Sequence, residues 1–288
     1  MTMSRNRSIP YQVKGILVKK LAIGKSRHEE KSKNSDGKSD LIHSWSTYNN
    51  YVKAGAAFGK WVKAKYKEKT VARMKIYVGE YLQYRIDQRL SAWTVALDAS
   101  ALAKLYGCKS TDFGVDLPKR KRAEVKRSRG EVKDFDEEKN KETVDFCKGT
   151  GLRNHELKAV TKQDVFCKEG RLFVHVRQGK GGKPRDVPVR SGFEKAVQSI
   201  ADKCTNEKEK LFKPEDIPGR LPSHKYRAEY AKAQYEALAR DVEKIPVSEK
   251  YICRKDKAGI VYDKKAMEKV SKMLGHNRIS VIAESYLY

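Results

Sequence analysis

Six side chains in the second half of the sequence are of types that could together act on a phosphodiester. They are two arginines, a lysine, two histidines and a tyrosine: Arg153, Arg227, Lys180, His224, His276 and Tyr286. A phosphodiester under attack develops negative charge on its non-bridging oxygens. Guanidinium groups match this charge because they donate paired hydrogen bonds and stay protonated at any working pH. The set is therefore suited to cutting and rejoining a phosphodiester without a metal.

Tyr286 is the candidate nucleophile of this set. A phenol with a pKa of about 10 is poorly ionised at neutral pH, so it needs cationic neighbours and a nearby base. His276 lies ten residues earlier and could help to supply both. Attack by the tyrosine would leave a phosphotyrosyl intermediate that conserves bond energy for rejoining. Tyr288 is a competing nucleophile, and Tyr286 is favoured over it.

Lys180 is the candidate general acid that protonates the leaving 5′ hydroxyl, because it lies in a glycine-flanked turn, GKGGKPR. Lys183 in the same turn is its competitor. The turn lacks the GxxxxGK[ST] spacing of a nucleotide phosphate loop and is expected in a hairpin rather than before a helix. We therefore expect no ATP binding and no cofactor.

The two arginines stand in different local contexts. Arg153 follows a glycine turn at the start of a helix, and Arg227 lies three residues after His224, which places that histidine and arginine on one helical face. In a chain this basic, either arginine alone would be read as a surface residue. The evidence is the whole pattern, not any one member.

Composition favours nucleic acid as the partner. The 63 Lys and Arg exceed the 37 Asp and Glu, which gives a formal net charge of +26. Such a charge suits a polyanion, although a soluble Lys-rich protein is the alternative, because net charge specifies no ligand. No apolar run reaches the roughly 18 residues of a membrane span, and no signal-peptide pattern opens the chain. A membrane partner is not expected.

The five cysteines are widely scattered and contain no CxxC pair. They are typical of reduced thiols in a cytoplasmic protein. Neither the cysteines nor the six histidines show the spacing of metal ligands, so we expect no metal site.

The elements that must position these residues fall into two domains joined by a linker. Residues 1–40 are basic and polar and predict an extended or mobile N-terminal arm. Residues 41–117 predict a small helical domain, with a first helix capped by Ser46 or Thr47 and later helices through 71–90 and 91–107. Residues 118–130 predict a linker that lies along a phosphate backbone, with a solvated charge run as the alternative. Its basic residues are Lys119, Arg120, Lys121, Arg122, Lys126, Arg127 and Arg129.

Residues 131–288 predict a second domain of helices beside a small antiparallel sheet. A short helix ends at Gly151, and residues 171–176 and 186–189 predict two paired strands around the lysine turn. His175 in the first strand is interpreted as a packing or surface residue. Helices are expected over 192–203, 224–242 and 264–274, with a hairpin that pairs 251–253 with 260–262. The fold class is therefore mainly α with a small antiparallel β-sheet, an α+β fold.

Four motifs in this order resemble the tyrosine recombinase or phage integrase family. They are TGLRNHEL for the first arginine, GKGGKPRDVPV for the lysine hairpin, HKYR for the His-x-x-Arg box and LGHNRISVIAESY for the final histidine and tyrosine. The likeness covers about residues 140–288. The preceding helical segment is similar, more weakly, to the family's core-binding domain. The interval from Arg227 to His276, which contains the hairpin, is longer than usual in the family.

The resemblance implies roles for the individual residues. Arg153 and Arg227 would bind the scissile phosphate, Lys180 would protonate the leaving oxygen, and His224 and His276 would assist proton transfer and phosphate contact. Tyr286 would form a 3′ phosphotyrosine, and Glu156 would be a supporting residue that orients its neighbours.

The resemblance also implies a partner and an activity. It implies a site-specific recombinase that acts on double-stranded DNA as a homo-tetramer, associates with the nucleoid and integrates or excises a mobile element. A type IB topoisomerase-like enzyme and a non-catalytic DNA-binding protein with the same fold are the alternatives.

Overall fold

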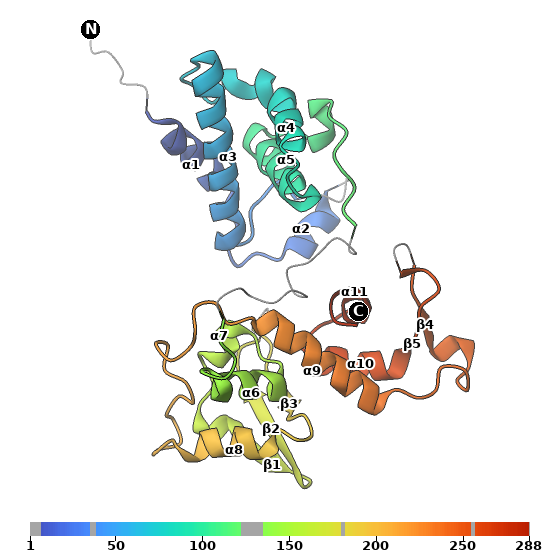
Figure 1. The fold of residues 1–288 in the computed structure, drawn as a ribbon. Coiled ribbons are helices and arrows are strands. Elements are labelled where there is room, and N and C mark those ends of the chain that lie inside the picture. Colours follow the sequence, from blue (N-terminus) through green and yellow to red (C-terminus); the bar gives the residue numbers. More distant parts are fainter. Residues whose placement is uncertain (1–6, 35–38, 122–134, 180–181, 255–256, 288) are drawn as a thin grey trace. The chain divides into compact units, whose positions relative to one another are not determined.

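The computed structural model describes residues 7–34, 39–121, 135–179, 182–254 and 257–287. Contacts between Cα atoms divide the chain into two compact units, Met1–Arg120 and Lys121–Tyr288. Each unit has its own hydrophobic core (Figure 1). The mainly helical content with small antiparallel sheets confirms the predicted fold class.

The N-terminal unit is all helical. Its elements are α1 (Ile9–Val18), α2 (Arg27–Lys33), α3 (Trp45–Tyr66), η1 (Arg73–Tyr77), α4 (Val78–Asp87), α5 (Ala92–Tyr106) and η2 (Ser110–Phe113). The long α3 packs against both α1 and α5. Gly55 and Gly59 face α1, where a Cβ on Gly59 would lie 2.3 Å from Ile9 Cγ2 and a Cβ on Gly55 would lie 2.8 Å from Val13 Cγ1. These glycines allow α1 to approach α3 closely.

The prediction of an extended arm over residues 1–40 is wrong for the helical parts of that segment. Ile9, Val13 and Leu17 recur every four residues, and all three are buried in the core of the unit. Pro10 in the first turn suits a helix start, because its missing N–H would have had no intrahelical partner. Only Lys14 is charged among the residues between these positions, but the basic and polar residues in the rest of 1–40 dominate the composition of that segment and hide the stripe.

Capping residues set the ends of the main helices in this unit. Ser44 caps α3 by accepting a hydrogen bond from the Thr47 amide at 3.2 Å, which corrects the predicted cap at Ser46 or Thr47. Ser91 caps α5 in the same way, through the Thr94 amide. Gly107 ends α5 in a left-handed conformation, with φ of 64°, as expected for a glycine at this position. The helix predicted over 71–90 forms as η1 followed by α4.

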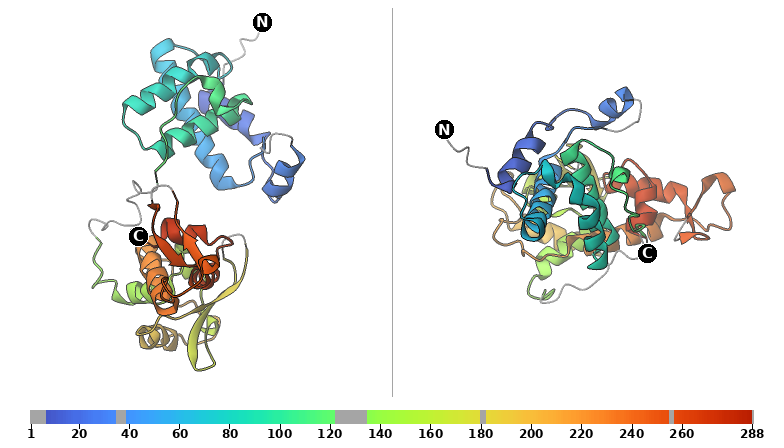
Figure 2. Two further views of the ribbon diagram at one scale, coloured as in Figure 1. Left: turned by 90° about the vertical axis from the view of Figure 1, so that its right-hand side faces the viewer. Right: turned by 90° about the horizontal axis from the view of Figure 1, so that it is seen from above.

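The C-terminal unit combines helices with two small sheets. Its elements are α6 (Lys141–Thr150), α7 (Asn154–Leu157), η4 (Lys162–Asp164), β1 (Val165–Lys168), β2 (Arg171–Val176), β3 (Arg185–Pro188), α8 (Glu194–Asp202), α9 (Ser223–Leu238), η5 (Val247–Glu249), β4 (Lys250–Ile252), β5 (Val261–Asp263), α10 (Lys264–Met273) and α11 (Ser280–Ser285). The first sheet has the antiparallel order β1-β2-β3, so the predicted strand pair gains a third strand, β1. Figure 2 shows this sheet as a narrow ribbon that reaches past α8.

The core of this unit lies between the sheet and the helices α6, α8, α9 and α10. Leu172, Val174 and Val176 alternate on β2 and are buried, as a strand with one covered face requires. Gly151 ends α6 with φ of 60°, and a Cβ there would lie 2.7 Å from Tyr230 Cδ1 on α9. Glycine therefore permits both the turn before Arg153 and the close packing of α6 on α9.

The second sheet is the hairpin β4–β5, which pairs Tyr251 with Tyr262 in the predicted register. Asp263 at its end is fully buried and caps α10 by accepting a hydrogen bond from the Lys265 amide at 2.9 Å. Arg240, which follows α9, donates to both carboxylate oxygens of Asp263, at 2.8 Å each. These bonds lower the pKa of Asp263 well below its ordinary range and anchor the hairpin to α9 and α10.

Candidate active site

Arg153 is held at the N-terminus of α7 by its own capping partner. Its backbone amide donates to Glu156 Oε2 at 2.8 Å, and its guanidinium Nη1 donates to Glu156 Oε1 at 2.9 Å. A carboxylate three residues into a helix commonly reaches back to the cap residue in this way. Within the motif TGLRNHEL, Glu156 therefore holds both the backbone amide and the guanidinium of Arg153. The Nη2 group points toward α10 and the turn that follows it.

Glu156 is shared with a second arginine, Arg185 on β3. Arg185 donates Nη1 to Oε1 at 2.9 Å and Nη2 to Oε2 at 2.8 Å, and its Nε donates to the Met273 carbonyl at 2.8 Å. Burial alone would raise the pKa of Glu156, which is 3% exposed, but the Arg185 bonds and the Arg153 amide lower it to about 2. The carboxylate is therefore ionised and joins α7 to β3, and Arg185 extends this connection to the end of α10.

Arg185 is not among the site residues predicted from the sequence. Two signals could have indicated a role for it: Arg185 ends the lysine turn GKGGKPR, and Glu156, the one acidic residue of TGLRNHEL, needs more than one donor when it is buried. Gly179 at the start of the turn packs on it, because a Cβ there would lie 2.7 Å from Arg185 Nη1. Arg185 thus anchors both sides of the hairpin that carries the predicted general acid.

Arg227 lies on α9 with 1% of its surface exposed. Its Nη1 donates to the Gly151 carbonyl, its Nη2 to the Leu274 carbonyl, and its Nε to Tyr286 Oη at 3.1 Å. Burial lowers the pKa of Arg227, because the charged guanidinium is removed from water. A buried cation satisfied by carbonyls and a phenol is a preorganised donor for an anion.

Four of the six predicted residues are brought together around the turn after α10. The Leu274 carbonyl accepts hydrogen bonds from both Arg153 and Arg227, so the two guanidinium groups converge on one atom. His276 Nε2 lies 3.5 Å from Arg153 Nη2 and 3.1 Å from Tyr286 Oη. The phenol of Tyr286 therefore contacts an arginine and a histidine at once.

Glycine allows this turn to form. Gly275 adopts φ of 65°, and a Cβ there would lie 3.2 Å from Arg185 Cδ. The backbone reverses between Leu274 and His276, which turns the Leu274 carbonyl and the His276 ring toward the same cluster.

Of the two remaining predicted residues, the structure describes His224 but not Lys180. His224 lies in the first turn of α9, one turn before Arg227, with an exposed side chain, and its role stays a prediction. Lys180 and Tyr288 lie outside the described residues. Lys183 is exposed, and its carbonyl accepts a hydrogen bond from the Gly179 amide at 3.0 Å, which closes the turn. His175 is half-buried on β2 and pairs across the sheet with Asp186 at 2.6 Å.

The electrostatics of the cluster favour an anion. Arg153 and Arg185 donate to the carboxylate of Glu156, and Arg227 adds a third guanidinium group to the cluster, so positive charge is in excess. Both carboxylate oxygens of Glu156 accept hydrogen bonds from Arg153 and Arg185. Arg227, the cation nearest to the phenol, is 1% exposed and donates one hydrogen bond from each nitrogen, which leaves one further N–H on each Nη for an anion.

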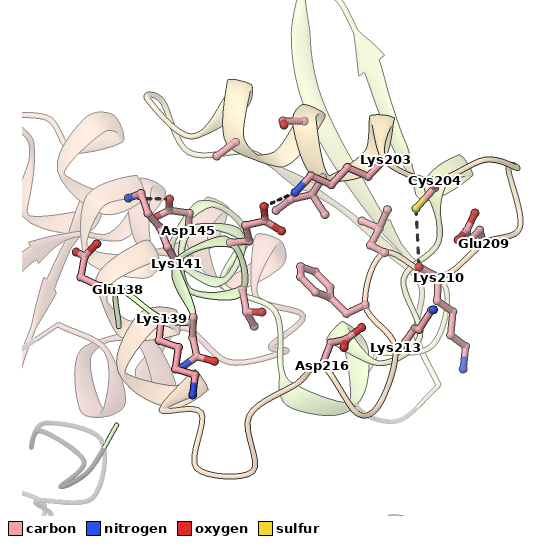
Figure 3. A pocket seen from close by; sticks show the side chains of 18 residues that line it. Glu138, Lys139, Lys141, Asp145, Lys203, Cys204, Glu209, Lys210, Lys213 and Asp216 are labelled. Atoms are coloured by element: carbon pink, nitrogen blue, oxygen red, sulfur yellow. Dashed lines mark hydrogen bonds and ion pairs between the residues drawn. The ribbon is translucent and has the colours of Figure 1, made fainter. Parts of the chain in front are cut away.

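A separate hollow of about 730 Å³ lies between the start of α6, α8 and the loop over residues 204–213 (Figure 3). Its walls mix both signs of charge, including an ion pair between Lys141 and Asp145, and Phe212 is one of the apolar residues that line it. None of the six predicted residues is among those that line it. The hollow therefore has no direct part in the cluster around Tyr286.

The predicted DNA-binding linker is only partly described. Lys119, Arg120 and Lys121 are exposed, whereas Arg122, Lys126, Arg127 and Arg129 lie outside the described residues. In the part of the chain that the structure covers, no group of three or more His, Cys, Asp and Glu side chains is placed to hold a metal ion. No helix within those ranges has the length and apolar character needed to cross a bilayer.

Comparisons with solved structures show what this fold is similar to. The chain resembles XerH site-specific recombinase bound to palindromic difH substrate in a post-cleavage complex, with a TM-score of 0.53, 13% identity and coverage of 96% of this chain and 90% of that one. It also resembles the Tn1549 transposon integrase in complex with circular intermediate DNA, with a TM-score of 0.50, 13% identity and coverage of 98% and 96%. The chain also resembles XerH bound to difH substrate in a pre-cleavage complex, with a TM-score of 0.53, 14% identity and coverage of 97% of this chain and 92% of that one. At these identities the likeness concerns the fold.

The family is shown by sequence. A family model described as the phage integrase family matches residues 124–287, and a search of curated proteins finds no match. Since the matched segment is more than half of the chain, this protein belongs to the phage integrase family, whose members are tyrosine-type site-specific recombinases. The predicted family resemblance is confirmed.

Proposed function

We propose that this recombinase cleaves and rejoins DNA through a covalent bond between Tyr286 and a 3′ phosphate. The observation that carries the proposal is the environment of the phenol: Tyr286 Oη lies 3.1 Å from Arg227 Nε and 3.1 Å from His276 Nε2. A phenol needs a base to take its proton and a cation to stabilise the phenolate, and these two groups supply them.

The chemistry proceeds in one displacement and its reverse. Tyr286 Oη attacks the phosphorus and passes its proton to His276, while the bond from phosphorus to the 5′ oxygen breaks. Arg153 and Arg227 stabilise the charge that develops on the non-bridging oxygens. Lys180 protonates the leaving 5′ oxygen, and His224 assists phosphate contact. Rejoining runs the same steps backward with a 5′ hydroxyl as nucleophile, so neither a metal nor ATP is required.

The proposed substrate is a specific site in double-stranded DNA. The net charge of +26 and the exposed Lys119, Arg120 and Lys121 support a phosphate partner. The XerH and Tn1549 structures are complexes with DNA, which supports the same class of partner for this chain. We further propose a nucleoid-associated homo-tetramer that joins two duplexes, with an N-terminal core-binding unit and a catalytic unit, and a role in moving a mobile element.

The experiment uses DNA from either side of the gene, with a nick placed so that cleavage releases a short fragment and traps the protein. Wild-type protein and a Tyr288→Phe control form a covalent adduct, whereas Tyr286→Phe forms none. An adduct of undiminished yield with Tyr286→Phe would contradict the nucleophile assignment. Catalytic relaxation of random supercoiled plasmid by the monomer would instead favour a type IB topoisomerase-like enzyme.

A further inference from the structure

Among the described residues, the Ala283 and Leu287 carbonyl groups near the end of the chain accept hydrogen bonds from side chains. The amides of Tyr286 and Leu287 both donate to the Ile282 carbonyl, each at 3.0 Å. The Ala283 carbonyl therefore does not receive the Leu287 amide that a continued helix would supply. Carbonyls at a helix end favour a cation or another donor beside them.

The hairpin β4–β5 provides those donors. Lys257, between the two strands, donates its ammonium group to the Ala283 carbonyl at 2.6 Å and also to the Leu287 carbonyl. Tyr262 on β5 donates its hydroxyl to the Leu287 carbonyl at 3.2 Å. Tyr286 lies between the two residues whose carbonyls are held. The hairpin thus fixes the chain on both sides of the proposed nucleophile.

The hairpin is itself anchored to α9 and α10, so it can hold the chain around Tyr286 in a fixed position. Tyr262 packs edge-on against Tyr235 of α9, with ring centroids 5.5 Å apart, and Asp263 joins Arg240 to the start of α10. Cys253 at the end of β4 is buried, and its amide donates to the Ile260 carbonyl at 2.9 Å. In Figure 1 the hairpin rises from the same side of the unit as α11.

We propose that Lys257 and Tyr262 form a hairpin latch, a pair of positioning residues that holds Tyr286 in the active site of its own chain. The proposal rests on Tyr286 being the nucleophile. It gives a role to the long interval between Arg227 and His276: the inserted hairpin keeps the tyrosine within reach of both groups. The latch acts on the backbone around Tyr286 and does not touch the phosphate.

The first test replaces Lys257 by Met, which keeps the length and removes the donor. Backbone amide exchange of the C-terminal peptide that contains Tyr286 and Leu287 should rise roughly tenfold or more, because loss of the latch frees the segment to open locally. Lys244→Met is the matched control, since the Lys244 side chain is 84% exposed and its ion pair is with Asp241, three residues earlier on the same segment. Unchanged exchange in Lys257→Met would overturn the latch, whether or not the protein forms an adduct.

The second test measures single-turnover adduct formation at saturating protein. Lys257→Met should slow this step roughly tenfold to a hundredfold, the effect of misplacing a reacting group by about 1 Å, and leave the dissociation constant for DNA unchanged. Lys257→Arg, which keeps a cationic donor, should recover much of the rate. A folded Lys257→Met protein with a wild-type rate would contradict the proposal, while a wild-type protein without any adduct would reject the proposed function instead.

The third test asks whether the latch acts within one chain. Equal amounts of Lys257→Met and Tyr286→Phe proteins are mixed on the same substrate. If the latch acts within a chain, the mixture forms no more adduct than Lys257→Met alone, because no chain has both an intact latch and a nucleophile. Recovery of adduct in the mixture would show that one chain's hairpin receives a neighbour's tyrosine, and the proposal would be wrong.

Discussion

Arg227 and Tyr286 show how single residues are prepared for the proposed chemistry. The Arg227 guanidinium is almost fully buried and donates hydrogen bonds to two backbone carbonyls and to the Tyr286 phenol. Arg227→Lys keeps a charge but loses the planar set of donors, so adduct formation should fall roughly a hundredfold to a thousandfold. Rapid-quench assays of the trapped adduct measure this, and DNA affinity from gel shifts should change little. A rate within threefold of wild type would contradict the role of Arg227.

The ion pairs of Glu156 should make the stability of the fold depend on pH. Its pKa of about 2 lies below the ordinary value, so the ion pairs stabilise the fold above about pH 5, and the stabilisation is lost as the pH falls toward 2. At neutral pH the contribution is about 3 kcal/mol. Glu156→Gln should therefore lower the melting temperature at pH 7, and the difference from wild type should shrink steadily between pH 5 and pH 2. A difference that stays constant over this range would contradict the assignment.

At the scale of elements, the turn at Gly151 links the end of α6 to the site. Gly151→Ala would force a left-handed alanine and place its Cβ 2.7 Å from Tyr230 Cδ1. Gly170→Ala is the matched control, because Gly170 has φ of 72° but no atom within 4 Å of an added Cβ. Backbone strain alone should lower the free energy of unfolding of the control by about 1 kcal/mol. The clash with Tyr230 should lower that of Gly151→Ala by about 1–3 kcal/mol more. Equal decreases in the free energy of unfolding, measured with urea, would show that contact with Tyr230 is not what requires glycine at position 151.

Several elements could be predicted because local and tertiary signals agree. The α5 helix (Ala92–Tyr106) is capped by Ser91 and Gly107, and the hairpin β4–β5 has the predicted pairing of Tyr251 with Tyr262. Helix α1 could not be predicted from composition, because its apolar stripe is only three residues, and their burial depends on Gly55 and Gly59 of a distant helix.

The same limit applies to the site. The types and order of the motifs predicted that Arg153, Arg227, His276 and Tyr286 act together, and the structure brings these four into contact. The bidentate pair of Arg185 with Glu156 could not be derived, because it joins residues 29 positions apart on different elements. Nor could the hydrogen bonds of Lys257, which depend on where a hairpin and the chain end meet in space.

At the scale of the whole molecule, the charge distribution predicts a salt-dependent affinity. Each cation that contacts a DNA phosphate adds about 0.9 to the slope of log affinity against log salt concentration. Replacing the exposed Lys119, Arg120 and Lys121 by Ala should therefore reduce the slope by up to about 3. Fluorescence anisotropy from low to moderate salt measures it. An unchanged slope would show that this segment does not lie along the DNA backbone.

The most direct test of the central claim is to identify the atom of the protein that carries the DNA. The trapped adduct is digested with nuclease and protease, and the modified peptide is sequenced by tandem mass spectrometry. The account predicts a nucleotide 3′ phosphate on Tyr286, the phenol that contacts Arg227 and His276. A phosphate found on Tyr288, or on any other side chain, would contradict it.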